Sequence, residues 1–376
     1  MINRRQFVLS ASASALGWSD GVQAQGSTIV LGQSAAFSGP AAQLGIQFHQ
    51  GAKLWFDQLN ARGGIAGRSV EIRNLDDGYE PERCVANTQA LIDADVFALF
   101  GYIGTPTSLA ALPLVRKSQI PFIAPFTGAM GLREPLLRNV FHLRASYNDE
   151  TALIVRQLTN LGLKKIAVFY QNDSYGKAGL NGSVLALSKI GLKPVAQATV
   201  ERNTVNVEDA VKTILAAAPD AVIQISAYKS CAAFIRAARK AGYGGTFYNV
   251  SFVGTQALAD ELGKDGAGVV VSQVVPSPSS PVRPISREFL AAIKNGGNKV
   301  QANYSSMEGF LAARLFTEGL QREAGKNISR ESLIRGLESL GRTQIGGFSV
   351  QLSPSSHVAS NFVELSMLTG DGRVRT

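Results

Sequence analysis

Short runs of β-branched and aromatic residues alternate along the chain with longer segments whose apolar positions recur every three or four residues. The short runs are typical of buried strands, and the longer segments are typical of helices that cover a sheet with one face. The predicted strands are residues 28–31, 70–73, 96–100, 120–124, 166–170, 195–200, 221–225, 247–250 and 268–273. The predicted helices between them are residues 44–61, a helix from 81, and 109–117, 176–190, 207–217, 229–241 and 255–262. This alternation predicts an α/β fold with mostly parallel sheets.

A segment rich in proline and serine, residues 276–281, interrupts this pattern and is expected to be a loop or a domain crossover. The helices predicted after it are residues 285–294, 304–323 and 330–340. Because they have few strands of their own to cover, we expect them to return to the first sheet, which gives two domains joined by several strands. The last two predicted strands, residues 348–352 and 362–368, form either a hairpin or two separate strands.

Two neighbouring strands in the first half of the chain end in loops rich in glycine, threonine and serine, Gly101–Ser108 and Pro125–Ala129. Ligands of open α/β sheets bind beyond the carboxyl ends of the strands. Small hydroxyl residues and free backbone N–H groups at a helix start suit an anionic group such as a carboxylate. The same residues also occur in ordinary turns between strands and helices. Because two such loops converge, the sequence predicts a binding cleft at this edge of the sheet.

The bulk properties of the chain limit the classes of protein that it can represent. Its 376 residues favour two domains over one core. The formal net charge is +9, but the lysines and arginines are scattered in runs no longer than two, so nucleic-acid binding is not expected. The basic surplus is interpreted as a mild bias toward anionic ligands or surfaces, or as an aid to solubility.

The N-terminus has the pattern of an export signal. Arg4 and Arg5 precede a short stretch rich in serine and alanine that ends near Trp18, and small residues up to Ala24 suit a signal peptidase. A twin-arginine signal and a Sec-type signal with two chance basic residues would both export the chain. We therefore predict a signal peptide at residues 1–24, cleaved after Ala24, and a mature protein without a membrane-spanning segment.

Signatures of enzymes and of metal or cofactor sites are missing from the sequence. It contains no nucleophile elbow, no phosphate loop ending in Gly-Lys-Ser/Thr and no His-Glu-x-x-His motif. His49, His142 and His357 have no cysteine or carboxylate at ligand spacing. Cys84 and Cys231 are expected to be buried free thiols. We therefore expect no metal, no cofactor and no enzymatic activity.

From about Thr28 to Leu368 the chain resembles the periplasmic solute-binding proteins of ABC importers, specifically the leucine/isoleucine/valine-binding group with the type I fold. The order and spacing of several segments carry this resemblance. These segments are Ser38–Gly45, Asn60–Arg68, Asp76-Asp77, Gly101–Ser108, Pro121–Gly128, Asn172–Gly176 and Tyr304–Leu315. The resemblance implies two α/β lobes, each a mostly parallel sheet flanked by helices, joined by three hinge crossovers. The implied boundaries are residues 25–145 with 275–346 for the N-terminal lobe and 146–274 with 347–376 for the C-terminal lobe.

The resemblance also implies where a ligand is held. In that family the first lobe holds the ligand's carboxylate with hydroxyl and backbone N–H groups, and the second lobe places aromatic rings over the ligand. The matching residues here are Thr107, Ser108, Phe126, Thr127 and Gly128 in the first lobe, and Tyr175 and Tyr228 in the second. The alternative interpretation makes Thr107 a plain helix cap and Tyr175 a packing residue.

Two positions depart from the amino-acid binders of that family. Ser251 stands where those proteins carry an acid that meets the ligand's ammonium group, and Leu44 stands where they carry a pocket aromatic residue. A buried ammonium group without a carboxylate is poorly compensated. The sequence therefore favours an acid without an amine, or a neutral amide, unless another acid such as Asp173 meets the ammonium group.

The sequence thus predicts a periplasmic, monomeric substrate-binding protein of an ABC importer. By hinge closure it would capture a small carboxylate-bearing solute, either similar to a branched-chain amino acid or a related acid or amide, and deliver it to an inner-membrane permease. A sensory binding protein that reports its ligand to a receptor uses the same two lobes and stays an alternative. A two-domain α/β enzyme is the third alternative, and it would need a titratable pair that faces the cleft.

Overall fold

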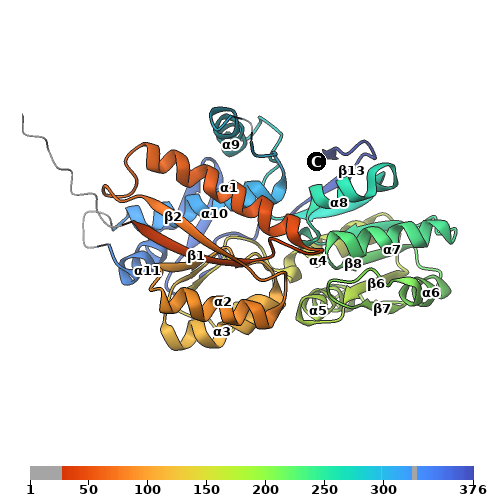
Figure 1. Ribbon diagram of the computed structural model, residues 1–376. Coiled ribbons are helices and arrows are strands. Elements are labelled where there is room, and N and C mark those ends of the chain that lie inside the picture. The colour runs from red at the N-terminus through yellow and green to blue at the C-terminus, as the bar shows by residue number, and fades with distance from the viewer. Residues whose placement is uncertain (1–27, 298, 324–327) are drawn as a thin grey trace, which may run out of the picture.

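The computed structural model describes residues 28–376 with the exception of residues 298 and 324–327. The signal peptide predicted at residues 1–24, with its cleavage site after Ala24, lies outside the described residues. The described chain forms two α/β lobes that lie side by side (Figure 1). Within the described residues, no helix is both long enough and apolar enough to cross a membrane.

The first lobe is built on a five-stranded parallel sheet with the strand order β2-β1-β3-β4-β5. Its strands are β1 (Ile29–Ala35), β2 (Val70–Asp76), β3 (Ala98–Phe100), β4 (Phe122–Ile123) and β5 (Val140–Phe141). Its helices are α1 (Ala42–Ala61), α2 (Pro81–Asp93), α3 (Thr105–Ser118), α9 (Pro284–Asn295), α10 (Tyr304–Gln321) and α11 (Arg330–Glu338). In Figure 1, α1 and α10 lie on one side of this sheet and α2 and α3 on the other.

The second lobe is built on a seven-stranded sheet with the order β14-β13-β10-β9-β8-β6-β7. Its strands are β6 (Ile166–Gln171), β7 (Gln197–Val200), β8 (Ala221–Ile225), β9 (Thr246–Asn249), β10 (Val270–Gln273), β13 (Glu364–Leu368) and β14 (Val374–Arg375). Its helices are α4 (Tyr147–Asn160), α5 (Ser174–Ser188), α6 (Glu208–Ala216), α7 (Tyr228–Lys240) and α8 (Thr255–Leu262). Strands β6 to β10 pair in parallel, and β13 and β14 add antiparallel pairs at one edge.

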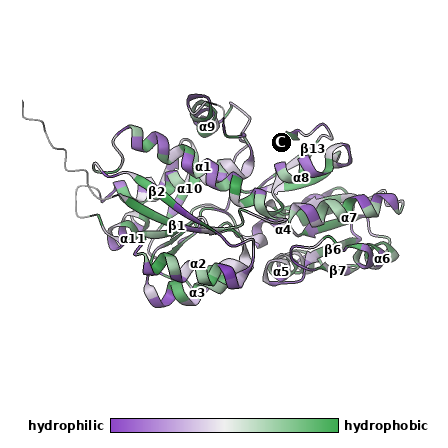
Figure 2. Cartoon of the chain, viewed as in Figure 1, coloured by the Kyte–Doolittle hydropathy of each residue, from purple (hydrophilic) through white to green (hydrophobic). Residues whose placement is uncertain are grey.

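Burial on both faces explains why the strands read as apolar runs. Every residue of β8 is buried, and in β1 all but Val30 are buried. A parallel sheet covered by helices on both faces needs such continuous apolar strands. Figure 2 shows green over the first part of β1, whereas the surrounding helices carry purple as well as green. The predicted α/β fold class with two lobes is therefore confirmed.

The chain passes between the two sheets three times, after β5, after β10 and before β13. Between the last two passages, β11 (Gly341–Ile345) and β12 (Phe348–Leu352) form a separate antiparallel hairpin. The predicted lobe boundary between residues 346 and 347 falls in the turn of this hairpin, and the boundaries stay a prediction. Of the two alternatives for the last strands, the second is correct, because β12 pairs with β11 whereas β13 pairs with β10.

After β5, the sequence correctly predicts the return of the late helices to the first sheet but misses helix α4. The return of the late helices to the first sheet is confirmed, since α10 packs along α1. Helix α4 is not among the predicted helices, although Ser146 caps it by accepting from the Asp149 N–H group while Asp149 accepts from Ser146. Such a reciprocal capping box is a recognisable helix start. Cys84 and Cys231 are buried and unpaired, as predicted.

Candidate ligand site between the lobes

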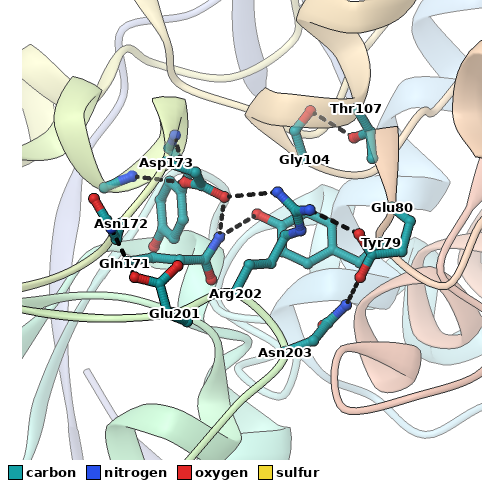
Figure 3. A network of polar contacts seen from close by, with 12 residues as sticks. Tyr79, Glu80, Gly104, Thr107, Gln171, Asn172, Asp173, Glu201, Arg202 and Asn203 are labelled. Carbon is teal, nitrogen blue, oxygen red and sulfur yellow. Dashed lines mark hydrogen bonds and ion pairs between the residues drawn. The ribbon is translucent and has the colours of Figure 1, made fainter. Parts of the chain in front are cut away.

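The predicted loops of the first lobe lie next to each other at the carboxyl end of the first sheet. The hydroxyl groups of Thr105 and Thr127 lie 2.6 Å apart, which joins the start of α3 to the loop after β4. The Thr107 hydroxyl instead donates to the carbonyl group of Ile103 and to that of Gly104, and Figure 3 shows the second of these contacts. Its O–H group is therefore engaged by the backbone just before α3, and Thr105 supplies the hydroxyl group that connects the two loops.

Gly128 brings the start of the second lobe onto these loops. The Tyr147 N–H group donates to the Gly128 carbonyl oxygen over 2.8 Å. A Cβ atom at residue 128 would lie 2.6 Å from both the backbone nitrogen and the Cδ1 atom of Tyr147, so a larger residue does not fit without movement. The close approach places the Tyr147 phenol near Thr105 and Thr127, although its hydroxyl group forms no hydrogen bond of normal geometry with them.

Aromatic rings from both lobes meet at this interface. Phe252, which follows β9, has its ring centroid 4.5 Å from that of Tyr175 in the second lobe. In the first lobe, the centroid of Phe126 is 5.7 Å and that of Tyr79 is 5.8 Å from the Phe252 ring. Tyr147 lies 5.4 Å from Tyr175. The predicted residues Phe126 and Tyr175 are thus brought together, and Phe252, Tyr79 and Tyr147 join them.

The remaining predicted residues lie around this aromatic cluster. Leu44, at the start of α1, contacts Gly254 of the second lobe, since a Cβ atom there would lie 2.4 Å from Leu44 Cδ2. Tyr228 begins α7, and its hydroxyl group interacts with the backbone of Gln43. Ser108 is fully buried in α3. Both Leu44 and Tyr228 therefore lie where the two lobes touch.

A buried ion pair lies beside the cluster. Arg144, in the first passage between the lobes, donates through Nε and Nη2 to the two carboxylate oxygens of Glu308 on α10, over 2.8 and 2.7 Å. Burial by itself would lower the pKa of Arg144. The charge of the Glu308 carboxylate and the hydrogen bonds to it have a larger effect, so the pKa of Arg144 is raised. The guanidinium group lies over the Phe126 ring, 4.0 Å from its centroid. The charges of Arg144 and Glu308 therefore compensate each other at the lobe interface.

Glu150, in the first turn of α4, brings a carboxylate to the predicted residue Ser251. Its Oε2 atom accepts from the Ser251 N–H group over 2.7 Å and from the Ser272 hydroxyl group over 2.5 Å, and its Oε1 atom accepts from the Ser251 hydroxyl group. Burial raises the pKa of Glu150. An acid is thus present beside Ser251, but second-lobe donors engage both of its oxygens.

A polar network links the lobes at the rim of the same interface (Figure 3). Glu80, just before α2, accepts from Arg202 Nη2 and from Asn203 Nδ2, each over 2.7 Å. Arg202 Nη1 also lies 3.5 Å from Asp173 Oδ2. Gln171 completes the network by donating to Asp173 over 2.6 Å and to the Tyr79 hydroxyl group over 3.3 Å. We call Glu80, Asp173, Arg202 and Asn203 the interlobe latch.

The conformation of Tyr79 is itself a sign of a functional site. Its φ angle is +64°, in the left-handed region that side chains rarely adopt, and its N–H group donates to Asp77 Oδ1 over 2.8 Å. This conformation costs about 1–2 kcal/mol for a residue with a Cβ atom, and such strain clusters at binding sites. The turn thereby presents the fully buried Tyr79 ring to Phe252 and its hydroxyl group to Gln171.

The buried polar atoms without a hydrogen-bond partner in the described part of the chain include Gln171 Oε1 and Arg202 Nε of the polar network, and four atoms of the loops, the aromatic cluster and the ion pair described above. These four atoms are Ser108 Oγ, Arg144 Nη1, Tyr147 OH and Tyr175 OH. All four can donate a hydrogen bond. Burial raises the pKa of both tyrosines, so their hydroxyl groups stay protonated. Both lobes therefore contain unused donors at the candidate site.

The sequence interpretation missed several residues of this site, namely Tyr79, Thr105, Arg144, Tyr147, Glu150 and Phe252. One signal was available for Arg144, because a single arginine within the apolar segment 140–145 predicts a buried charge that needs a partner. Thr105 belongs to the glycine- and threonine-rich loop that the sequence singled out. Nothing local marks Phe252 or Tyr79, whose roles depend on contacts across the interface.

Large surface hollows lie elsewhere on the molecule. One of about 720 Å³ is lined by the β11–β12 hairpin and residues 356–362, together with Arg283. Another of about 800 Å³ lies between α1 and the segment 295–300 and is lined by Lys53, Asp57 and Arg62 among others. The candidate site is therefore defined by the buried contacts between the lobes and not by an open hollow.

The fold and the interface define a two-lobed α/β protein with a candidate ligand site between its lobes. The chain belongs to the periplasmic binding proteins, because the family described as "Periplasmic binding protein" matches residues 28–371. The predicted family is thereby confirmed, whereas the individual site residues stay a prediction.

Solved structures and curated relatives agree with this family. A possible leucine/isoleucine/valine-binding protein from Rhodopirellula baltica SH 1 is 35% identical with a TM-score of 0.90, over 95% of this chain and 98% of that chain. A substrate-binding periplasmic protein from Ralstonia solanacearum is 30% identical with a TM-score of 0.86, over 92% of this chain and 99% of that one. The Leu/Ile/Val-binding protein homolog 7 of Brucella suis biovar 1 is 24% identical over 370 residues, 93% of this chain and 90% of the relative.

Proposed function

We propose that this protein is the exported solute-binding component of an ABC importer, and that it captures a small carboxylate-bearing solute between its lobes. Membership of the periplasmic binding proteins supports this role, as do relatives named for the binding of leucine, isoleucine and valine. The proposal includes a periplasmic location, a monomeric protein and delivery of the solute to an inner-membrane permease.

The observation that carries the proposal is the set of unused donors at the lobe interface. Ser108, Arg144, Tyr147 and Tyr175 each bury a donor without a partner among the described residues. Leaving a buried donor unpaired costs about 1–3 kcal/mol, so a ligand that accepts from several of them gains affinity. A carboxylate offers about four lone-pair sites and favours charge-assisted hydrogen bonds with arginine.

Contacts between the lobes support hinge closure as the mechanism. The interlobe latch and the Phe252 contacts each join residues that belong to different sheets, so they depend on how closely the lobes approach. A ligand that contacts both lobes binds the closed form more tightly than the open form and therefore shifts the population toward closure. Capture by closure requires no chemical step.

A thermal-shift screen tests the proposed function. Purified mature protein is heated with amino acids, aliphatic acids, aromatic acids and the corresponding amides, and hits are titrated by calorimetry. We expect a carboxylate-bearing solute to raise the melting temperature, because a ligand of the native state stabilises it by mass action. Hits restricted to solutes without a carboxylate, or chemical turnover of the bound solute, would contradict the proposal.

A variant of the interlobe latch tests the closure mechanism. Arg202→Met removes the cation that links Glu80 to Asp173, so the closed form loses charge-assisted hydrogen bonds of about 1.5–3 kcal/mol before solvent screening. Because Glu80 and Arg202 are partly exposed, we expect a loss of about 1 kcal/mol, which is a dissociation constant about fivefold higher. Calorimetry measures the affinity, and small-angle scattering measures the closed fraction.

The matched control for the latch lies within one helix of the first lobe. Lys53→Met breaks the exposed Lys53–Asp57 pair of α1, which joins no second element. We expect Lys53→Met to leave the dissociation constant and the closed fraction as in the wild type. An unchanged affinity in Arg202→Met would show that the latch does not contribute to closure.

A further inference from the structure

The carboxylates at the lobe interface are as informative as the donors. The acids there, within the described chain, include Glu80, Glu150, Asp173 and Glu308, as well as Asp77, which accepts from Ser34 and from the Tyr79 N–H group. Glu308 is engaged by Arg144 through both oxygens, and Glu80 by Arg202 and Asn203. Both oxygens of Glu308 and of Glu80 therefore already accept hydrogen bonds from protein donors.

Asp173 and Glu150 are engaged just as fully. Asp173 Oδ1 caps α5 by accepting from the N–H groups of Tyr175 and Gly176, and its Oδ2 atom accepts from Gln171. Glu150 accepts from Ser251 and Ser272 through both oxygens. The charge of each acid is therefore already compensated by protein donors, and an ammonium group would have to share the carboxylate oxygens with them.

The acceptor that stays unused at the interface is neutral. Gln171 Oε1 is buried without a partner, and the donation from Gln171 Nε2 to Asp173 fixes which end of the amide is which. An amide oxygen can accept from a hydroxyl or amide group of a ligand, but it does not compensate the charge of a buried ammonium group. One of the unused donors, Arg144 Nη1, belongs to a guanidinium group, which favours an anionic acceptor.

The body of the ligand would meet apolar surface. Phe126, Phe252 and Leu44 are fully or almost fully buried at the interface, and the rings of Tyr79 and Tyr175 pack against Phe252. Aromatic and aliphatic side chains with a few convergent polar groups are typical of small-molecule sites. Such surroundings favour an aliphatic or aromatic body.

We propose that the solute is a carboxylate with an apolar body and no amine, because protein donors already compensate the acids named above, with Ser251 and Ser272 donating to Glu150. This inference rests on the proposed function of carboxylate capture and names the class of solute. On this proposal Ser251 donates to Glu150 and does not contact the ligand. Ser108, Arg144, Tyr147 and Tyr175 are the donors assigned to the carboxylate.

Ligand pairs that differ in a single ammonium group test the inference on the wild-type protein. Calorimetry compares 4-methylpentanoate with L-leucine and 3-phenylpropanoate with L-phenylalanine, and the tightest acid of the screen with its α-amino counterpart. We expect the acid of the tightest pair to bind at least tenfold more tightly than the amino acid. The carboxamide of that acid should bind at least tenfold more weakly than the acid itself.

The outcomes separate this inference from the proposed function. An amino acid that binds as tightly as its amine-free partner, or more tightly, overturns the inference and leaves carboxylate capture standing. If the carboxamide binds as tightly as the acid, or if no carboxylate in the screen binds, carboxylate capture itself fails, and the inference with it.

Loss of one hydroxyl group tests the assigned donors. Tyr175→Phe and Tyr147→Phe each keep the ring and remove the unused hydroxyl group, and we expect the dissociation constant of the acid to rise at least fivefold in each. Tyr170→Phe, on β6, is the matched control and should bind as the wild type does. Wild-type affinity in both Tyr175→Phe and Tyr147→Phe would overturn the assignment of these donors to the carboxylate.

Discussion

We expect Arg144→Met to lower the free energy of unfolding by about 3–5 kcal/mol, because Glu308 is left as an uncompensated buried charge. Both side chains are almost completely buried, with exposed fractions of 1% for Arg144 and 4% for Glu308, so water cannot replace the lost partner. The variant should also lose ligand binding, since Arg144 carries one of the unused donors at the interface. Denaturant unfolding measures the first effect and calorimetry the second.

A double variant separates stability from binding in this experiment. In Arg144→Met/Glu308→Leu neither charge is buried, and apolar replacement of a buried ion pair is often nearly neutral. We expect the double variant to regain about 2 kcal/mol or more relative to Arg144→Met, yet still not to bind the solute. A single variant that loses less than about 1 kcal/mol, or a double variant that is less stable than the single one, would contradict the importance of this pair.

We expect Gly309→Ala to lower the free energy of unfolding by about 3 kcal/mol, because it forces α1 and α10 apart. A Cβ atom at residue 309 would lie 2.0 Å from the carbonyl oxygen of Phe48 and 3.0 Å from the backbone nitrogen of Ala52. Alanine would otherwise favour a helix by about 1 kcal/mol, so the sign of the measured change decides which effect is larger. Denaturant unfolding of the mature protein gives the value.

Gly244→Ala is the matched control for this substitution. A Cβ atom at residue 244 would meet no neighbouring heavy atom within 4 Å, and the φ angle of this residue lies outside the left-handed region. We expect the stability of this variant to stay within about 0.5 kcal/mol of the wild type or to rise slightly. If Gly309→Ala behaved in the same way, the close packing of α1 on α10 would not be required for stability.

Several parts of the candidate site could be predicted from the sequence, because they depend on residues that are close together in the chain. The glycine- and threonine-rich loop after β3 and the loop after β4 do converge, and Phe126 and Tyr175 do reach the same aromatic cluster. Asp173 could be recognised as a helix cap from its position before the next helix, and it accepts from two N–H groups of α5. Capping and loop chemistry depend on residues close in sequence, so they can be inferred without the fold.

The choice among neighbouring hydroxyl residues could not be made in this way. Thr105 and Thr107 are both plausible in the loop, yet Thr105 contacts Thr127 whereas Thr107 donates to the backbone just before α3. Two residues along a helix point in different directions, so their roles depend on the exact start of α3. The boundaries of elements are the least certain part of a sequence interpretation.

By itself, the sequence determined most of the strands and helices and an α/β class with two domains, because apolar periodicity and loop composition are local properties. The resemblance to a known family indicated the family and its two-lobed arrangement. Tertiary structure alone decided that Arg144 meets Glu308, that Phe252 meets Tyr79, and that Ser251 holds Glu150. The partners in each of these pairs lie far apart in the chain. Such contacts arise from the way two sheets and three crossovers bring distant segments together, and no pattern along the chain specifies them.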